Sequence, residues 1–294
     1  MVPILSFVGW SGIGKTTLLE KLIPELVRRG YRVATVKHVH HFSMDHEGKD
    51  TWRYRQAGAR LVALPEHFAC LGSDDDTAAA AQPVDGPLVA RFRKLAGKLE
   101  IFLLLGSFPE RTPGKARPYN TSLLLGPRGQ ILASYRKLHL FDVDLPGAPP
   151  SRESASTHPG DEVVTAALPG ESFTAGLSIC YDLRFPELFR AQVSRGANLL
   201  LLPAAFTVST GRDHWETLLR ARAIENLSYV VAPGQWGQHA PGRRTYGRSL
   251  IIDPWGLILA QAPDGEGVVM ARLDYERLQR LRRELPCLRH RRLP

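Results

Sequence analysis

Cysteine is scarce in this chain, with three residues among 294. Cys70, Cys180 and Cys287 are odd in number and far apart, so they indicate neither a disulfide framework nor a cysteine-rich zinc motif. Thiols of this kind are typical of a reducing compartment. The first residues also lack the layout of a secretory signal peptide, because their short apolar run leads directly into a glycine-rich loop. We therefore expect a cytoplasmic protein.

Long hydrophobic runs are also absent, and no stretch reaches the roughly 20 apolar residues that a membrane-spanning helix needs. The hydrophobic content of 44% is ordinary for a globular protein, and the chain is long enough to bury a large core. Internal repeats are missing as well. These absences argue against membrane-embedded and repeat architectures and leave one large soluble domain with an N-terminal addition.

The net charge is +9, and much of the excess lies near the C-terminus. In that region eight arginines face three acidic residues, the arginines being Arg272, Arg277, Arg280, Arg282, Arg283, Arg289, Arg291 and Arg292. A nucleic-acid patch is one interpretation. No aromatic interleaving or binding-module pattern accompanies the arginines, so we favour a solvated or subunit-facing tail. We expect a homodimer or higher homo-oligomer without a nucleic-acid partner, and the positive field would favour an anionic substrate.

Four histidines lie between residues 38 and 46, close enough in sequence to bind a metal adventitiously. No cysteine or pair of carboxylates completes a recognisable four-ligand spacing around them. We therefore predict no metal site of the protein itself. His139 and His214 are expected to make structural hydrogen bonds instead.

The N-terminus carries a phosphate-binding pattern. An apolar run over residues 3–8 leads into a loop that fits GxxxxGK[ST] at every fixed position, and a helix-like run over residues 16–29 follows. In such a loop backbone N–H groups hold phosphates, Lys15 reaches the terminal phosphates, and the Thr16 hydroxyl can hold Mg²⁺. The candidate nucleotide-binding residues are Gly9, Gly12, Gly14, Lys15, Thr16 and Thr17.

Strand and helix patterns alternate along the rest of the chain, which predicts an α/β fold. The expected strands cover residues 101–105, 121–125, 131–135, 175–179, 199–203, 229–232, 249–253 and 268–273. The expected helices cover residues 87–99, 186–195, 215–226 and 275–284. Turns at residues 126–129 and 253–256 indicate hairpin connections. The stretch at residues 74–81, rich in aspartate and alanine, is expected to be a surface loop entering a helix.

Three residues with complementary chemistry each follow a strand-like segment: Glu66, Lys137 and Cys180. A thiol is mostly protonated at neutral pH and becomes a good nucleophile only where a base or a positive charge favours the thiolate. Glu66 can serve as that base and Lys137 as that charge. After attack on a carbonyl, Lys137 and the backbone N–H of Tyr181 can stabilise the oxyanion. Each residue taken alone is more often a buried hydrophobe or a solvated surface group, so their order and context carry the prediction.

In order and context these residues resemble the nitrilase or carbon-nitrogen hydrolase superfamily, from about residue 60 to the C-terminus. The resemblance implies an α-β-β-α sandwich and catalytic roles for Glu66, Lys137 and Cys180. It also implies a second glutamate, matched by Glu153, that helps to position the substrate amine and the lysine.

Within the superfamily, residues 135–146, 214–225, 249–256 and 285–292 look most like the deaminated glutathione amidase group. That group hydrolyses the side-chain amide of a glutathione whose amino group has become a keto group, and it releases ammonia. The related omega-amidases act on smaller keto-acid amides. The resemblance implies a hydrolase of linear amides with a small-molecule amide substrate and no cofactor.

The first sixty residues are instead similar to the N-terminus of molybdopterin-guanine dinucleotide biosynthesis protein B, a GTP-binding family. This predicts a fusion, with a P-loop segment at residues 1–59 and the hydrolase domain at residues 60–294. The expected strand at residues 32–36 and helix at residues 46–59 would replace the first strand and helix of the hydrolase. The resemblance implies GTP and Mg²⁺ as ligands of the P-loop. Two alternatives to an amidase follow: a GTP-binding accessory protein of molybdenum cofactor assembly, and an inactive hybrid.

Overall fold

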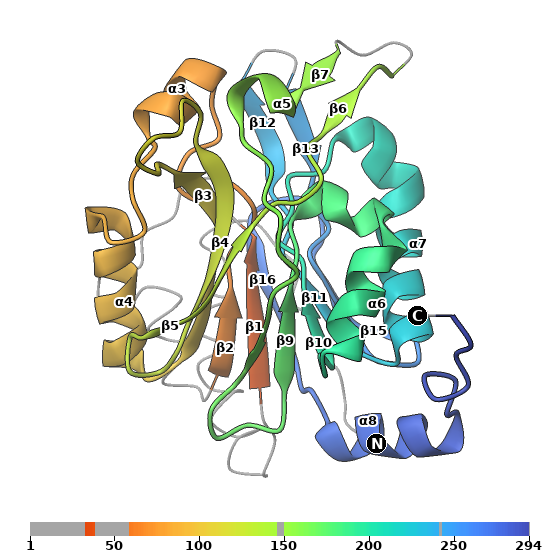
Figure 1. Cartoon of the computed structure of the whole chain (residues 1–294). Helices are drawn as coiled ribbons and strands as arrows, with labels where there is room; N and C mark the ends of the chain where they lie inside the picture. The colour runs from red at the N-terminus through yellow and green to blue at the C-terminus, as the bar shows by residue number, and fades with distance from the viewer. Residues whose placement is uncertain (1–32, 39–58, 146–149, 241–242, 294) are drawn as a thin grey trace.

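Two six-stranded sheets form the centre of the structure (Figure 1). The structure is a computed structural model that describes residues 33–38, 59–145, 150–240 and 243–293. The first sheet has the order β16-β1-β2-β3-β4-β5 and contains β1 (Val33–His38), β2 (Ala59–Ala63), β3 (Phe102–Glu110), β4 (Tyr119–Leu125), β5 (Ile131–Arg136) and β16 (Gly267–Ala271). The second has the order β15-β14-β11-β10-β9-β8 and contains β8 (Thr165–Ala167), β9 (Thr174–Leu177), β10 (Leu199–Leu201), β11 (Tyr229–Ala232), β14 (Leu250–Ile252) and β15 (Ile258–Gln261).

Helix α4 (Pro87–Leu99) covers the outer face of the first sheet, and α6 (Pro186–Ser194) and α7 (Val208–Asn226) cover that of the second. The other described helices are α3 (Asp74–Ala79), α5 (Glu153–Ser156), the 3-10 helix η1 (Cys180–Arg184) and α8 (Tyr275–Glu284). Two small hairpins join β6 (Asp142–Val143) to β7 (Ser151–Arg152) and β12 (Trp236–Ala240) to β13 (Arg243–Tyr246). Figure 1 shows α4 on one side of the paired sheets and α6 with α7 on the other, which is the predicted α-β-β-α arrangement.

The central strands β2, β3 and β4 of the first sheet are buried on both faces, and the side chains of β2 and β3 alternate between two apolar clusters as the two-residue period of a strand requires. Val62 and Leu64 belong to the cluster under α4, whereas Leu61 and Ala63 belong to the cluster between the sheets. The side chains of β3 alternate between the same two clusters. Burial on both faces explains why these strands show a continuous apolar run in the sequence instead of an alternation of apolar and polar residues.

Helix α4 follows from its local sequence. Pro87 occupies the first helical turn, where its missing N–H costs nothing, and Glu100 ends the helix in a left-handed conformation with φ of 51°. The buried residues Val89, Phe92 and Leu99 recur at helical spacing and pack on the first sheet. This helix has the predicted bounds.

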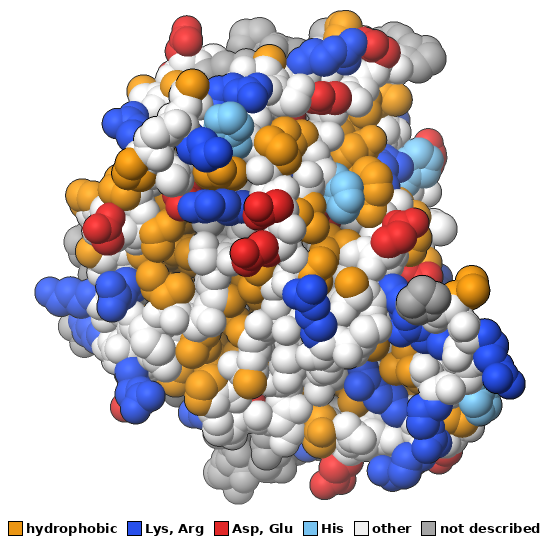
Figure 2. Space-filling view, viewed as in Figure 1, with side chains coloured by type: hydrophobic (Ala, Val, Ile, Leu, Met, Phe, Trp, Pro, Cys, Tyr) orange, Lys and Arg blue, Asp and Glu red, His pale blue; other side chains and the backbone are white. Residues whose placement is uncertain are grey.

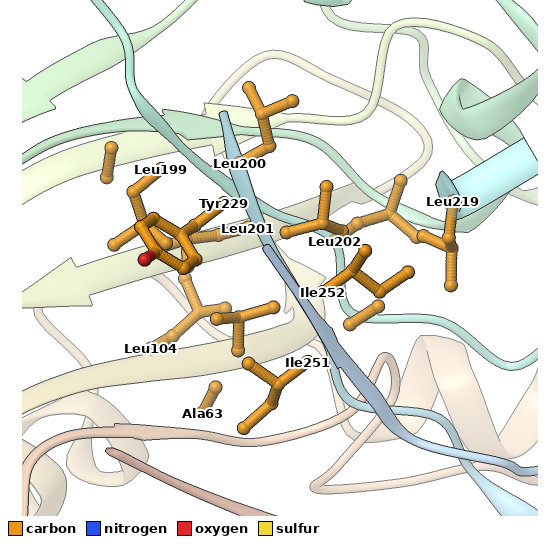
Figure 3. Packing of buried hydrophobic residues seen from close by; sticks show 14 of the residues in the cluster. Ala63, Leu104, Leu199, Leu200, Leu201, Leu202, Leu219, Tyr229, Ile251 and Ile252 are labelled. Atoms are coloured by element: carbon orange, nitrogen blue, oxygen red, sulfur yellow. The ribbon is translucent and has the colours of Figure 1, made fainter. Parts of the chain in front are cut away.

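The central core lies between the two sheets (Figure 3). Ala63 and Leu104 come from the first sheet, and Leu201 and Ile251 come from the second; all four are fully buried. Leu219 of α7 joins the same cluster from the outer face of the second sheet. Burying one leucine is worth about 1.5–3 kcal/mol, so this cluster is a main source of the stability that holds the strand ends in place.

Lysine and arginine side chains gather around α8 and the C-terminal tail, at the lower right of Figure 2. Some of these arginines are structural. Arg277 pairs with the buried Asp253 at 2.7 Å, and Arg282 donates to the Leu227 carbonyl at 2.9 Å. Others, such as Arg289, are exposed.

Most predicted elements are present, and the differences have local causes. Helix α7 begins at Val208. The prediction placed its start later, at residue 215, because the first two turns are polar and carry no apolar stripe. Residues 74–79 form α3, where a loop was predicted, because Ser73 caps this helix. Its hydroxyl accepts from the Asp76 N–H while the Asp76 carboxylate accepts from the Ser73 N–H, which is a capping box.

The strand predicted at residues 32–36 forms as β1, which pairs in parallel with β2 and antiparallel with β16. The P-loop at residues 9–17 lies outside the described residues. So do residues 46–58 of the predicted helix that follows, and Ala59 already belongs to β2.

Candidate active site

Glu66, Lys137 and Cys180 meet because the strands that precede them end at the same side of the sheets. Strand β2 is parallel to β3. Strand β5 runs in the same direction as both, because β3 is antiparallel to β4 and β4 is antiparallel to β5. Glu66 and Lys137 therefore leave the first sheet at the same edge. Strand β9 of the second sheet leads to Cys180, whose thiol interacts with the Glu66 carboxylate. Ligand sites of α/β sheets commonly lie at these carboxyl ends.

Lys137 is a buried cation held between two carboxylates. Its side chain is 2% exposed, and Nζ lies 3.1 Å from Glu66 Oε1 and 2.8 Å from Glu153 Oε2. Burial alone lowers the pKa of a lysine, but the charges of Glu153 and Glu66 outweigh burial and raise the pKa of Lys137 well above its usual range. Lys137 is therefore a fixed positive charge and cannot serve as a base near neutral pH.

Glu66 is a buried carboxylate with partners on both oxygens. Oε2 accepts from the Ala205 N–H at 2.7 Å, and Oε1 accepts from the Asn120 side-chain amide at 3.0 Å. Burial raises the pKa of Glu66, but the Lys137 charge and a hydrogen bond from Cys180 lower it, and the net result is a pKa of about 2. Glu66 is therefore ionised at neutral pH and can accept a proton.

Glu153, at the start of α5, is the second carboxylate in contact with Lys137. Its Oε2 accepts from the Phe141 N–H at 2.7 Å. Its Oε1 accepts from Lys137 Nζ at 3.0 Å and from the Asn120 amide at 3.3 Å. The Asn120 amide thus bridges Glu66 and Glu153, and this arrangement fixes the two acceptors on either side of the ammonium group.

Cys180 lies on a strained turn between β9 and α6. Its φ is 48°, in the left-handed region that residues with a side chain rarely occupy, and its N–H donates to the Pro203 carbonyl at 2.9 Å. Such strain persists only where the surrounding structure imposes it, and it is frequent at active sites. The turn presents the thiol, 8% exposed, toward the carboxylate of Glu66.

The resting form of Cys180 is the thiol. Burial and the charge of Glu66 raise the pKa of Cys180 well above its usual range, and the nearby charge of Lys137 lowers it without compensating. The prediction that Lys137 favours the thiolate thus describes only one of the opposing effects. A thiolate can form here when Glu66 takes the proton, so nucleophile and base are coupled.

Aromatic side chains and one cation lie beside the nucleophile. Tyr181 directly follows Cys180, and its ring packs edge-on against Phe141 with a centroid distance of 5.0 Å. The Arg184 guanidinium lies 5.5 Å from the centre of the Phe206 ring and 5.9 Å from that of Tyr181. Arg184 also bonds to Nδ1 of His214 at 3.2 Å, and this is the structural role predicted for that histidine.

Two groups of the site were not found from the sequence. Asn120 is a polar residue in the buried strand β4, and that mismatch was an available signal. The Ala205 N–H had none, because a backbone donor leaves no mark in the sequence. Both reach Glu66 across the fold, from positions 54 and 139 residues away.

The coupling of thiol and carboxylate gives a prediction for Glu66→Gln. Removing the charge of Glu66 takes away a cause of the raised thiol pKa and leaves the opposing charge of Lys137, so the pKa of Cys180 is expected to fall. The measurement is the pH dependence of Cys180 alkylation by iodoacetamide, read by peptide mass spectrometry with Cys287 as an internal control. An unchanged or higher midpoint in the variant would contradict this account.

Comparisons with known proteins identify the family. The pattern of the carbon-nitrogen hydrolase family matches residues 28–283. The chain belongs to the carbon-nitrogen hydrolase family. It is 44% identical over 235 residues to the deaminated glutathione amidase of Synechocystis sp. (strain PCC 6803 / GT-S), covering 80% of this chain and 86% of that protein.

Solved structures agree with this assignment to the carbon-nitrogen hydrolases. The C. elegans NitFhit protein has a TM-score of 0.77 and 38% identity, with 89% of this chain and 65% of that chain covered. Saccharomyces cerevisiae Nit3, a member of branch 10 of the nitrilase superfamily, has a TM-score of 0.75 and 30% identity, with 89% and 97% covered. The chain therefore has the nitrilase-superfamily fold.

The family match also corrects a prediction. It begins at residue 28, after the P-loop and before β1, so the replacement of the hydrolase's first strand by a P-loop segment is not supported. In the first sheet β1 pairs with both β2 and β16, so the strand that begins at residue 33 lies within the part of the chain that the family pattern matches.

Two kinds of feature are absent from the described part of the chain. None of its helices is both long and apolar enough to cross a bilayer. Within those same residues, no three His, Cys, Asp or Glu side chains are arranged to hold a metal ion.

Proposed function

We propose that this carbon-nitrogen hydrolase is an amidase that cleaves the side-chain amide of a keto-acid amide such as deaminated glutathione and releases ammonia. One observation carries the proposal. The Lys137 ammonium bonds to Glu66 and Glu153 in a buried site, and the Cys180 thiol interacts with the Glu66 carboxylate there. The name of the Synechocystis relative supports the substrate class.

The acylation half begins with proton transfer from Cys180 to Glu66 as the sulfur attacks the amide carbon. The carbonyl oxygen gains negative charge, and Lys137 Nζ with the backbone N–H of Tyr181 stabilises it. Glu66, now protonated, gives its proton to the amide nitrogen. The carbon–nitrogen bond breaks, ammonia leaves, and a thioester remains on Cys180.

The deacylation half uses the same groups in reverse. Glu66 removes a proton from water, and the resulting hydroxide attacks the thioester carbon. Lys137 again stabilises the oxyanion, and Glu153 keeps the ammonium in place through its two contacts. The thiolate leaves and regains its proton from Glu66, and the product is a carboxylic acid.

Ammonia release from the deaminated glutathione amide, a smaller keto-acid amide and an aliphatic nitrile tests the proposal. The tripeptide should be the preferred substrate, measured as kcat/KM. Preference for the smaller keto-acid amide would move the assignment toward the omega-amidases. Comparable rates on the nitrile would move it elsewhere in the superfamily.

We also propose that Arg184 binds a carboxylate of the substrate, because its half-buried guanidinium lies beside Tyr181, the residue after the nucleophile. Arg184→Met is expected to raise KM for keto-acid amides about tenfold or more, as for the loss of a hydrogen bond between charged groups. An uncharged amide should be hydrolysed as by the parent. Arg190→Met, on α6, is the matched control and should leave KM unchanged, whereas equal effects in both variants would contradict this role.

The glycine-rich sequence ahead of the family match carries a separate proposal. We expect weak, Mg²⁺-assisted nucleotide binding that depends on Lys15 and hardly changes amidase turnover, because the phosphate contacts need only backbone donors and one lysine. Calorimetric titration of GTP and ATP into the parent and Lys15→Ala is the test. Tight guanine-selective binding with hydrolysis would instead favour the molybdenum-cofactor accessory function, and no binding would refute the P-loop prediction.

A homodimer or higher homo-oligomer in the cytoplasm remains part of the proposal. The exposed side chains of Trp255 and Leu257, at 56% and 54%, are apolar surface that a second copy could cover. Light scattering after size-exclusion chromatography measures the oligomeric state.

A further inference from the structure

We propose that Asp182 is a positioning residue that holds the segments carrying Lys137 and Cys180 at a fixed separation. Asp182 is fully buried, in η1. Its carboxylate bonds to both segments at once. Oδ2 accepts from the Tyr135 hydroxyl at 2.6 Å and from the Ile179 N–H at 2.8 Å.

The other oxygen completes the link. Oδ1 accepts from the His139 backbone N–H at 3.1 Å and from His139 Nδ1 at 2.7 Å. Tyr135 and His139 flank Lys137 symmetrically, two residues before and two after it in the chain. The His139 ring is further fixed by stacking on Phe185, with a centroid distance of 3.6 Å and an angle of 7°.

The contact to the nucleophile is equally direct. Ile179 immediately precedes Cys180, whose left-handed backbone must be imposed by its surroundings. The bond from Ile179 N–H to Asp182 closes the turn on one side of Cys180, and the bond from the Cys180 N–H to Pro203 restrains it further. A single carboxylate therefore restrains the strained turn and the lysine segment together.

A carboxylate suits this position because it only accepts hydrogen bonds. Four donors point at the two oxygens of Asp182, and an ionised carboxylate can satisfy all of them. Asparagine has nearly the same shape, but its NH₂ group would replace one of the two oxygens. That group donates hydrogen bonds, so it could not accept from the donors that now bond to that oxygen. Asp182→Asn thus leaves the volume unchanged and disrupts one side of the link, either at Ile179 and Tyr135 or at His139.

This inference rests on the proposed amidase function, so its test has a readout that does not need turnover. For Asp182→Asn we expect kcat to fall about a hundredfold with little change in KM, since a displacement of about 1 Å between catalytic groups has that effect. We also expect the pH midpoint of Cys180 alkylation to move down toward that of an ordinary thiol, because the thiol leaves the surroundings that raise its pKa.

Asp253→Asn is the matched control. Asp253 is equally buried and also accepts several bonds, from the Trp255 and Leu257 N–H groups and from Arg277. Asp253→Asn should lower the melting temperature and retain the parent kcat and alkylation midpoint. Parent values of both quantities in Asp182→Asn, or equal losses in the two variants, would overturn the proposal.

A second variant decides the case if Asp182→Asn does not fold. Tyr135→Phe keeps the ring and removes only the hydroxyl that bonds to Asp182 Oδ2 and accepts from the Leu138 N–H. It should lower kcat and shift the alkylation midpoint in the same direction, and parent values of both would refute the role of Asp182. If the parent releases no ammonia, the proposed function fails, and the alkylation midpoints alone decide on the positioning role.

Discussion

Replacing Cys180 by alanine is expected to lower ammonia release by about four orders of magnitude or more, because the variant has no nucleophile to form the thioester. Water cannot replace it at a comparable rate, since Glu66 is placed to take a proton from the thiol in the first step. The fold should be retained. Alanine loses only one sulfur atom, and the backbone bond from residue 180 to Pro203 does not involve the side chain.

The measurement is coupled-assay ammonia release with the keto-amide tripeptide, together with circular dichroism and a melting curve. Cys287→Ala is the matched control, because Cys287 is a half-buried thiol near the C-terminus that is expected to play no part in turnover. Mass spectrometry of rapidly quenched parent should detect an acyl group on Cys180 and none in Cys180→Ala. Retained ammonia release in that variant would rule out the thioester mechanism.

The second large effect is expected for Lys137→Met, which should lower kcat/KM by a hundredfold or more, roughly the loss seen when an oxyanion donor is removed. The ammonium bonds to Glu66 and Glu153, so its removal also leaves two buried carboxylates without their cation. Breaking a buried ion pair in this way costs about 3–5 kcal/mol of unfolding free energy.

The loss of Lys137 has a pH consequence with a definite sign. The pKa of Glu66 is about 2 largely because of Lys137, so it is expected to rise in Lys137→Met. A base works only when ionised, and the residual activity of the variant should therefore be lost at a higher pH than that of the parent as the pH falls. Lys98→Met, at an exposed position on α4, is the control and should keep the parent profile.

The rate of acylation separates this role from a purely structural one. Lys137→Met should accumulate acyl-enzyme more slowly than the parent, because formation of the tetrahedral intermediate is the step that the ammonium assists. If intact-mass spectra showed acyl-enzyme forming as readily as in the parent, the assigned role of Lys137 would be wrong.

Local patterns in the sequence were sufficient for several elements. Helices α4 and α8 and strand β11 have their predicted bounds, because apolar spacing and end signals such as Pro87 act within a few residues of each other. The hairpins β6–β7 and β12–β13 were not predicted. Strands β6 and β7 have two residues each, and β12 and β13 are mostly polar and show no run of apolar residues like that of β11. Helix α3 shows that a capping side chain just outside an element, here Ser73, can determine whether that element forms.

The amino-acid sequence by itself determined the family and the candidate chemistry of this protein: the α/β fold, and Glu66, Lys137 and Cys180 at the ends of strand-like segments. Only the tertiary structure decided how these groups behave. Asn120 and the Ala205 N–H reach Glu66 from distant parts of the chain, and the balance of burial and neighbouring charge keeps Cys180 a thiol. Hydrogen bonds and electrostatic forces depend on distance in space, and strand order and packing set that distance. Ala205 and Glu66 are 139 residues apart in the sequence, so no local pattern predicts how close they lie.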